Sequence, residues 1–528
     1  MRKQLTLKLS PADATSTENL KQHISQELRI PMDSIHGVSI IRKSIDARSK
    51  RPWILITVMV YINEPLLPSR GNEIQFQNVS HARHQVIIVG SGPAGLFAAL
   101  KLLESGIRPV ILERGKDVRS RRRDLALLNK SGIINPESNY CFGEGGAGTY
   151  SDGKLYTRST KRGDVNRILN MFVQFGADEK ILYESHPHIG TNKLPGIITS
   201  MRNAIMASGG QFLFDQKVID FIIDHNSLKG VKTASGETFS GQAVILATGH
   251  SARDIFNLLL TRKIAIESKS FALGVRVEHP QSLIDTIQYH HPDRGEFLPP
   301  ASYNLVQQVD DKGVFSFCMC PGGIIAPAAT SPGELVVNGW SPSKRNNPYA
   351  NSGIVVAVSE KDIARYLLKN KAGDVGHQHE ELQGMYFQQA VEKKAFDAGG
   401  GKFVAPAQRL VDFVQKKTSA TLPDCSYVPG LQSSALNEVL PGFIFNALQK
   451  AFVHFDKKMK GYYTNDAVVV ATESRTSSPV RVPRDHTLQH PMVRGLYPCG
   501  EGAGYAGGIV SAAMDGEKVA SRIVESFA

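Results

Sequence analysis

The sequence has no apolar run long enough to cross a membrane. Its longest apolar stretch, from Ile54 to Ile62, falls well short of the roughly 20 residues that a membrane helix needs, and Lys or Arg interrupts every longer one. The start of the chain, Met1 to Ser10, has a positive tip but lacks the apolar segment of a secretory signal. We therefore expect a cytoplasmic protein with no membrane partner.

Cysteine is also scarce. The 528 residues include five cysteines, an odd number that fits reduced thiols better than a disulfide framework. There is no long basic tail, and 61 basic against 49 acidic residues is a mild excess at this length. The net charge of +12 thus indicates a basic solvated surface that also suits a phosphorylated cofactor. We expect a small-molecule substrate, with nucleic acid as the minority alternative, and the oligomeric state stays open.

The sharpest motif is a βαβ unit with a glycine-rich turn. An apolar strand, Gln85 to Val89, leads directly into Gly90-Ser-Gly92-Pro93-Ala94-Gly95, and helical periodicity continues to Glu104. In such a turn the first glycine permits the tight bend, the second lets the backbone approach a pyrophosphate, and the third allows close helix–strand packing. The next strand, Arg108 to Leu112, ends on Glu113, where a carboxylate accepts hydrogen bonds from ribose hydroxyls. The unit predicts a dinucleotide site.

Three further segments favour FAD over NAD as the dinucleotide. Cys141 to Lys154 is too glycine-dense for an ordinary helix or strand and suits a backbone that passes close to a flat ring. Ala243 to Gly249 reads as a buried strand that ends in a small-residue turn. Gly495 to Glu501 reads as a strand that ends in an acid, and a helix with a small-residue face follows it.

In this order the segments resemble the flavoprotein superfamily typified by glutathione reductase and fumarate reductase. Nearly the whole chain is similar to the bacterial family described as NAD(FAD)-utilizing dehydrogenases, with further matches at Phe271–Glu278, Phe317–Gly323 and Glu473–Arg481. The resemblance implies FAD as cofactor and an α/β fold, in which an FAD-binding Rossmann-like βαβ unit carries an inserted mixed α+β cap or substrate domain and a small N-terminal α/β domain. It implies no particular substrate.

The resemblance also implies a set of FAD contacts. It puts the pyrophosphate on the glycine turn, the adenosine ribose on Glu113 with Arg114 alongside, adenine on the backbone of Val218, and a ribityl hydroxyl on Glu501. The helix start at Gly508 and Ile509 would direct N–H groups at the flavin O2 side. Lys154 would either stabilise an anionic reduced flavin there or lie at the surface. The expected contacts are Gly90, Gly92, Pro93, Ala94, Gly95, Glu113, Arg114, Gly145, Gly146, Gly148, Thr149, Gly153, Lys154, Val218, Thr248, Gly249, Gly500, Glu501, Gly508 and Ile509.

A chain of this length exceeds one hydrophobic core, and the patterns divide it into four segments. Residues 1–80 form the small N-terminal domain and end in a linker that includes Pro65, Pro68 and Gly71. Residues 81–255 are the first part of the FAD-binding domain. Residues 256–462 are the inserted cap, and 463–528 return to the FAD-binding domain with a strand at Tyr463–Ala471.

The inserted domain offers candidate catalytic residues. Arg345 and Arg475 lie in polar turns, where each can hold a substrate carboxylate beside the flavin or staple the cap to the FAD domain. Cys318 and Cys320 are either a redox pair or two buried thiols, and strand alternation would put both on one face. His377-Gln-His379 and His186-Pro-His188 lack partner ligands nearby, so no metal is predicted.

The leading hypothesis is an FAD-dependent oxidoreductase, a dehydrogenase that moves hydride between flavin N5 and an unidentified substrate. No second strand–GxGxxG–helix unit follows the first, so no dedicated NAD(P)H domain is expected, although NAD(P)H stays open as the electron donor. The basic charge and the extra N-terminal unit leave an FAD-dependent RNA-modifying enzyme as an alternative. A flavin-binding protein without turnover is another.

Overall fold

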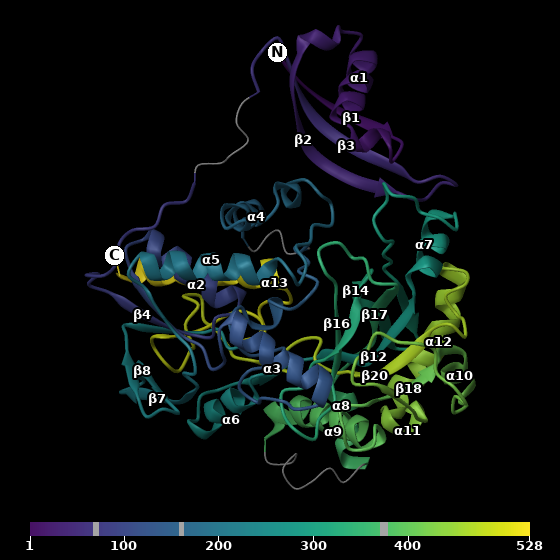
Figure 1. Ribbon diagram of the computed structural model, residues 1–528. Helices are drawn as coiled ribbons and strands as arrows, with labels where there is room; N and C mark the ends of the chain where they lie inside the picture. The colour runs from purple at the N-terminus through teal and green to yellow at the C-terminus, as the bar shows by residue number, and fades with distance from the viewer. Residues whose placement is uncertain (67–72, 158–162, 370–378, 528) are drawn as a thin grey trace.

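The computed structural model describes residues 1–66, 73–157, 163–369 and 379–527. Pro68, Gly71 and His377 lie outside these ranges. The chain forms a small N-terminal domain, a parallel-sheet domain and a domain built on a large mixed sheet (Figure 1). In the described ranges no helix is both long and apolar enough to cross a membrane.

The N-terminal domain pairs one helix with a three-stranded antiparallel sheet. The sheet order is β1-β3-β2, with β1 at Arg2–Leu9, β2 at Ile35–Asp46 and β3 at Trp53–Ile62. Alternate residues of β3 are fully buried, because successive side chains of a strand face opposite sides of the sheet. The helix α1 (Thr17–Leu28) begins at the N-cap Ser16, whose side chain accepts from the Asn19 N–H, and covers that buried face.

A five-stranded parallel sheet with the order β22-β10-β4-β5-β6 forms the centre of the second domain. Its strands are β4 (Gln85–Val89), β5 (Arg108–Leu112), β6 (Gln211–Leu213), β10 (Ala243–Leu246) and β22 (Leu496–Pro498). Layers on both faces bury these apolar strands. One face packs against α2 (Pro93–Glu104), α4 (Val165–Gln174), α5 (Leu194–Ala207) and α13 (Ile509–Phe527). The other packs against α6 (Arg253–Thr261) and the antiparallel strands β7 (Val218–Asp224), β8 (Ser227–Thr233) and β9 (Thr238–Ser240). The Rossmann-like α/β fold predicted from the sequence is confirmed.

The third domain, the cap, is built on a seven-stranded mixed sheet with the order β13-β14-β17-β12-β20-β18-β19. Its strands are β12 (Phe271–Pro280), β13 (Val306–Val309), β14 (Lys312–Cys320), β17 (Tyr349–Val358), β18 (Ala405–Arg409), β19 (Leu431–Ser433) and β20 (Val468–Glu473). Its helices are α7 (Gln281–Tyr289), α8 (Glu360–Lys369), α9 (Gln383–Ala398), α10 (Leu410–Gln415), α11 (Leu436–Val439) and α12 (Gly442–Lys458). The short pairs are β15 (Ile324–Pro327) with β16 (Val337–Trp340), and β11 (Glu267–Ser268) with β21 (Val480–Arg481).

One strand differs from its expected place. The sequence predicts a strand at Tyr463–Ala471 as part of the FAD-binding domain. The observed strand, β20 (Val468–Glu473), lies instead between β12 and β18 in the cap sheet. The boundary expected at residue 463 therefore falls inside the cap. All residues of β20 are buried, and the sequence of such an apolar strand does not indicate which sheet it joins.

The N-terminal domain contacts the rest of the chain through strand β2. The Lys43 N–H donates to the Tyr183 carbonyl at 2.8 Å, and the Ser185 N–H donates to the Lys43 carbonyl at 2.9 Å. The same segment continues to Pro187, whose carbonyl accepts from the Leu155 N–H at 2.9 Å. Residues 183–187 thus lie between the N-terminal domain and the loop that carries Lys154.

Candidate active site

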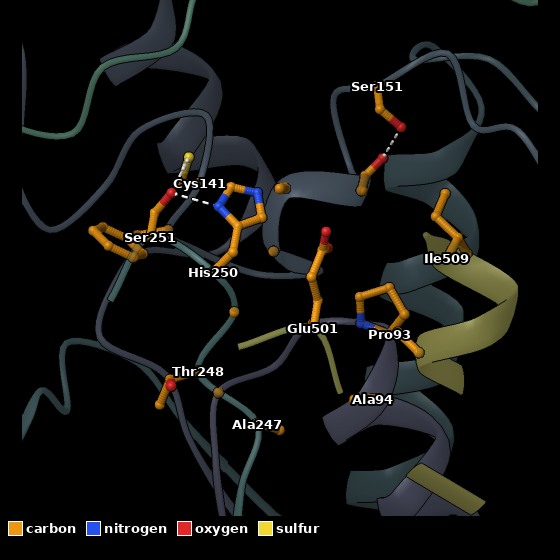
Figure 2. A pocket seen from close by; sticks show the side chains of 18 of the residues that line it. Pro93, Ala94, Cys141, Ser151, Ala247, Thr248, His250, Ser251, Glu501 and Ile509 are labelled. Atoms are coloured by element: carbon orange, nitrogen blue, oxygen red, sulfur yellow. Dashed lines mark hydrogen bonds between the residues drawn. The ribbon is translucent and has the colours of Figure 1, made fainter. Parts of the chain in front are cut away.

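A cavity of about 370 Å³ lies at the carboxyl ends of β4, β5 and β10 and beside the N-terminus of α2. In parallel sheets this edge is the usual ligand site. Segments far apart in the sequence meet there, including the 141–154 segment, residues 247–251, Glu501 and the start of α13 (Figure 2).

The glycine turn has the shape that a bound pyrophosphate needs. Gly90 has φ +102°, and a Cβ there would lie 2.5 Å from the Ala247 carbonyl oxygen. A Cβ on Gly92 would meet only the Gly146 Cα, at 3.9 Å, so the backbone at Gly92 is open toward the cavity. No side chain caps α2, so its first N–H groups are free to bind an anion.

The Glu113 carboxylate accepts hydrogen bonds from the glycine turn and from two neighbouring loops. One carboxylate oxygen accepts from the Ser91 N–H at 3.0 Å and from the Ser91 hydroxyl at 2.6 Å. The other accepts from the N–H groups of Gly115 at 2.9 Å and Gly143 at 3.0 Å. These four donors occupy all the lone-pair directions of a carboxylate. A ribose hydroxyl, the predicted partner of Glu113, would compete with them.

Glu501 presents a different kind of carboxylate. It follows β22 and lies on the cavity wall (Figure 2), and its side-chain carboxylate makes no hydrogen bond or ion pair within the part of the chain that the structure describes. Burial, which the Lys269 charge only partly offsets, raises the pKa of Glu501 to about 7. A half-buried carboxylate without a partner on the cavity wall fits a ligand hydroxyl. The cavity, the open glycine backbone and this acceptor therefore fit FAD.

Most of the predicted cofactor contacts line this cavity. Four do not: Gly95, Gly145, Thr149 and Gly500. Gly95 packs instead, since a Cβ there would lie 2.0 Å from the Gly90 carbonyl oxygen. Thr149 bonds the Glu144 carbonyl at 2.6 Å, and the N–H groups of Gly145 and Gly500 donate to Ser91 and Asp515. These residues shape the loops behind the wall.

Lys154 lies on the wall, and its ammonium group faces the cap. Its Nζ is 3.6 Å from the Cys318 sulfur, 3.8 Å from the Cys320 sulfur and 3.7 Å from an Asp152 oxygen. Burial opposes its charge, but Cys318, Cys320 and Asp152 outweigh burial and raise the pKa of Lys154 above its ordinary value. Three of the predicted catalytic residues therefore meet at one point, although 164 positions separate Lys154 from Cys318 in the sequence.

Both candidate arginines form ion pairs, and that of Arg345 crosses from the cap to the FAD-binding domain. Arg345 lines neither this cavity nor the smaller one described below, and it pairs through two nitrogens with Asp152, the shorter contact being 2.8 Å. Arg475 lies on the wall, but its nitrogens bond Glu392, Glu334 and Thr330. Of the two predicted roles, the geometry of Arg345 matches the staple between the cap and the FAD-binding domain, whereas Arg475 bonds residues of the cap.

The wall also includes residues that were not among the predicted contacts, and three of them contact one another. The Ser251 hydroxyl lies 2.9 Å from His250 Nδ1 and donates to the Cys141 sulfur at 3.4 Å (Figure 2). Burial, with the charges of Arg475 and Arg253, lowers the pKa of His250 to about 4. His250 and Ser251 lie in the turn that follows β10, so the rule that ligands bind at the carboxyl ends of parallel strands could have found these two.

A second, smaller cavity of about 80 Å³ adjoins the first. Cap residues, including Trp340 and Glu473, form one side of it, and Tyr140 and Tyr150 of the FAD-binding domain form the other. The two cavities share the wall residues Cys141, Ala147, Ser151, His250, Cys318, Asn338 and Arg475. The smaller cavity is therefore an extension of the larger one toward the cap.

Three family models match successive parts of the chain. Residues 84–259 match "Pyridine nucleotide-disulphide oxidoreductase", residues 270–476 match "FAD-dependent protein, C-terminal domain-like", and residues 1–61 match a domain of unknown function, DUF8436. FAD is thus the cofactor of this chain, as predicted from the sequence.

Among whole proteins, an uncharacterized protein of Clostridium beijerinckii is 39% identical over 526 residues, which cover 96% of each chain. Glycine oxidase from Bacillus cereus has 13% identity and a TM-score of 0.30 over 84% of this chain and 96% of its own. A geranylgeranyl bacteriochlorophyll reductase-like protein from Thermoplasma acidophilum has 13% identity and a TM-score of 0.36 over 84% and 78%. The chain belongs to the family of the Clostridium beijerinckii protein, within the superfamily of FAD-dependent oxidoreductases.

Proposed function

We propose that the chain is an FAD-dependent dehydrogenase that moves hydride between flavin N5 and a small substrate held in the smaller cavity. The observation that carries this proposal is the wall that the two cavities share. A molecule in the smaller cavity would lie next to the FAD site and be covered by the cap. At about 80 Å³ the smaller cavity holds only a small molecule or one end of a larger one.

Bound FAD supplies the hydride chemistry, and the chain binds it, orients it and excludes water. The uncapped start of α2 and the open backbone at Gly92 would hold the pyrophosphate. Glu501 would accept a hydrogen bond from a ribityl hydroxyl.

His250 is the residue placed to move a proton. Its pKa of about 4 makes the imidazole neutral at pH 7. In the tautomer that carries its proton on Nδ1, the ring donates to the Ser251 hydroxyl, 2.9 Å away, while that hydroxyl donates to the Cys141 sulfur. Nε2 is then an acceptor, and the ring lines both cavities. We assign His250 Nε2 as the base that takes a proton from the substrate as hydride leaves.

The test is anaerobic reduction of the purified holoprotein with NADH, NADPH and a panel of small metabolites, followed at the flavin absorbance band. We expect at least one metabolite to bleach the flavin. If NADPH or NADH alone bleaches it and no metabolite does, the dehydrogenase proposal is wrong and the chain is a reductase.

His250→Gln tests the assignment of the base. The amide keeps much of the volume but cannot take the proton, so flavin reduction by the active metabolite should slow by about 10²- to 10⁴-fold. FAD content should stay unchanged. The matched control is His454→Gln, since His454 is exposed on α12 and lines neither cavity. Equal rates for both variants would remove His250 from the mechanism.

A further inference from the structure

The end of strand β14 leaves regular strand geometry at Cys318. Its pairing with β17 shifts register between Phe317 and Cys320, and Cys318 has φ +49°. This left-handed conformation costs a residue other than glycine about 1–2 kcal/mol. In a regular strand, Cα atoms two residues apart lie about 6.6 Å from each other, at the upper limit of what a disulfide spans. The backbone at Cys318 is therefore not extended, so the two thiols are not held as far apart as in a regular strand.

Both thiols turn toward the same cation. Lys154 Nζ lies 3.6 Å from one sulfur and 3.8 Å from the other, and the Cys320 thiol reaches the Cys318 carbonyl at 3.2 Å. Arg276, which is fully buried, donates to that carbonyl at 3.3 Å and lies 4.0 Å from the Cys320 sulfur. Its own counter-ion is Glu473, at 2.6 Å. Two cations therefore surround the thiol pair.

The two thiols differ in acidity and in access. A hydrogen bond from the Cys320 thiol to the Cys318 sulfur, which its one hydrogen makes when it turns away from the Cys318 carbonyl, lowers the pKa of Cys318 well below its ordinary value. The Lys154 and Arg276 charges act in the same direction, and burial only partly opposes them. The pKa of Cys320 is raised, because it gives that hydrogen bond and is buried. Cys318 lines both cavities, whereas Cys320 is fully buried behind it. This is the division expected of an attacking thiolate and a resolving thiol.

We propose that Cys318 and Cys320 are a redox-active dithiol that exchanges two electrons with bound FAD and exchanges disulfide bonds with a small thiol in the smaller cavity. This inference rests on the proposed function for the place of the substrate. It names the substrate class as thiol or disulfide, whose electrons reach FAD through the Cys318–Cys320 pair and not as a hydride from the substrate. Lys154 holds the Cys318 sulfur as a thiolate, so it contacts a reacting atom.

The steps balance as follows. The Cys318 thiolate and the Cys320 thiol would become one disulfide and lose two electrons and one proton, all of which would pass to bound FAD. A thiolate from the small substrate then attacks the Cys318 sulfur, the protein disulfide breaks, and Cys320 takes up a proton. A second substrate thiolate attacks the sulfur of the first, which forms the substrate disulfide and releases the Cys318 thiolate. The sum is two thiols oxidised to one disulfide and one FAD reduced by two electrons.

Anaerobic titration with dithionite counts the electrons. Holoprotein oxidised with diamide should take up four electrons per chain, two for FAD and two for the disulfide. Cys320→Ser should take up two. The control Cys425→Ser, the same substitution elsewhere in the cap, should still take up four. Uptake of two electrons by the parent protein, with no mass loss of two hydrogens in the 318–320 peptide, would overturn the inference and leave the hydride proposal intact.

Alkylation tests the thiolate without any turnover. In the full-length chain stripped of flavin, iodoacetamide should modify Cys318 already below pH 7, as mass spectrometry of the peptide would show. Lys154→Met should slow this modification about tenfold at pH 7, and Lys154→Arg should restore it, which also checks that the site folds. The charged or titratable groups around this sulfur are Lys154, Asp152, Arg276, Cys320, Glu473 and Glu501. If the rate of Cys318 alkylation depends on pH as that of a free thiol does, in both the parent and Lys154→Met, then Cys318 is not a thiolate at neutral pH.

Discussion

At the scale of single residues, Glu113 joins three backbone segments. It accepts four hydrogen bonds from Ser91, Gly115 and Gly143 and is 4% exposed. Glu113→Gln replaces one acceptor oxygen by an NH₂ group that faces backbone N–H donors. We expect a loss of about 2–4 kcal/mol of stability, seen as a lower melting temperature of the flavin-free chain, and weaker FAD retention.

Glu237→Gln is the matched control for this variant. Glu237 is exposed, and its carboxylate accepts from the Gln216 side chain. Its substitution should change stability by less than about 0.5 kcal/mol. Equal melting temperatures for the two variants would show that Glu113 does not hold the loops together.

Glu501 predicts a pH dependence of the flavin-free chain. Its pKa of about 7 in the folded chain exceeds the ordinary value of 4.5, so the unfolded chain loses this proton at lower pH than the folded one. The associated stability is fully present below pH 4.5 and is lost as pH rises through 7. Glu501→Gln removes the titration. It should therefore raise the free energy of unfolding at pH 8 by an amount of order 2 kcal/mol, seen as a higher melting temperature, and by much less at pH 5. An equal rise at both pH values would contradict the shifted pKa.

At the scale of elements, α13 and α2 pack backbone to backbone beside the cavity. A Cβ on Gly516 of α13 would lie 2.1 Å from the carbonyl oxygen of Ala94, which lines the cavity at the start of α2. Gly516→Ala should push the helices apart, lower the melting temperature and weaken FAD binding at least tenfold, as measured by flavin release on dilution.

Gly196→Ala on α5 is the helical control. Gly196 is exposed, and a Cβ there would meet nothing within 4 Å. Because alanine is the better helix former, this variant should be up to about 1 kcal/mol more stable. If Gly516→Ala behaves in the same way, the close approach of α13 to α2 is wrong.

Elements set by neighbouring residues could be predicted from the sequence. The strand, glycine turn and helix from Gln85 to Glu104 are local, and the structure has them where the pattern puts them. The sheet that β20 joins, the left-handed backbone of Cys318 and the approach of Lys154 to both thiols could not be predicted. Each of these depends on partners far away in the sequence, and local periodicity carries no information about them.

At the scale of the whole molecule, Glu392 joins the cap to the FAD-binding domain. This fully buried carboxylate on α9 accepts from Arg253 of α6 at 2.9 Å and from Arg475 at 2.9 Å. Burial opposes its charge, but the two guanidinium groups outweigh burial and lower the pKa of Glu392 below its usual range. Glu392→Gln leaves both arginines undercompensated and should cost about 3–5 kcal/mol, measured as a lower calorimetric melting temperature.

Glu525→Gln is the control for this prediction. Glu525 pairs with Arg522 at 2.5 Å, but both side chains are largely exposed. An exposed pair contributes about 0–1 kcal/mol, so this variant should melt close to the parent. Glu392→Gln melting like Glu525→Gln would mean that the network does not connect the domains energetically.

The contact between strand β2 and residues 183–185 links the N-terminal domain to the thiol site. In the described part of the chain this domain contributes no residue to either cavity. Even so, Lys43 is bonded to a segment whose next residues, Pro187 and His188, pair with Leu155 and Lys154. The backbone that carries Lys154, whose ammonium group contacts Cys318, is therefore bonded through one short segment to the N-terminal domain. A displacement of the N-terminal domain would therefore also move the backbone that holds Lys154.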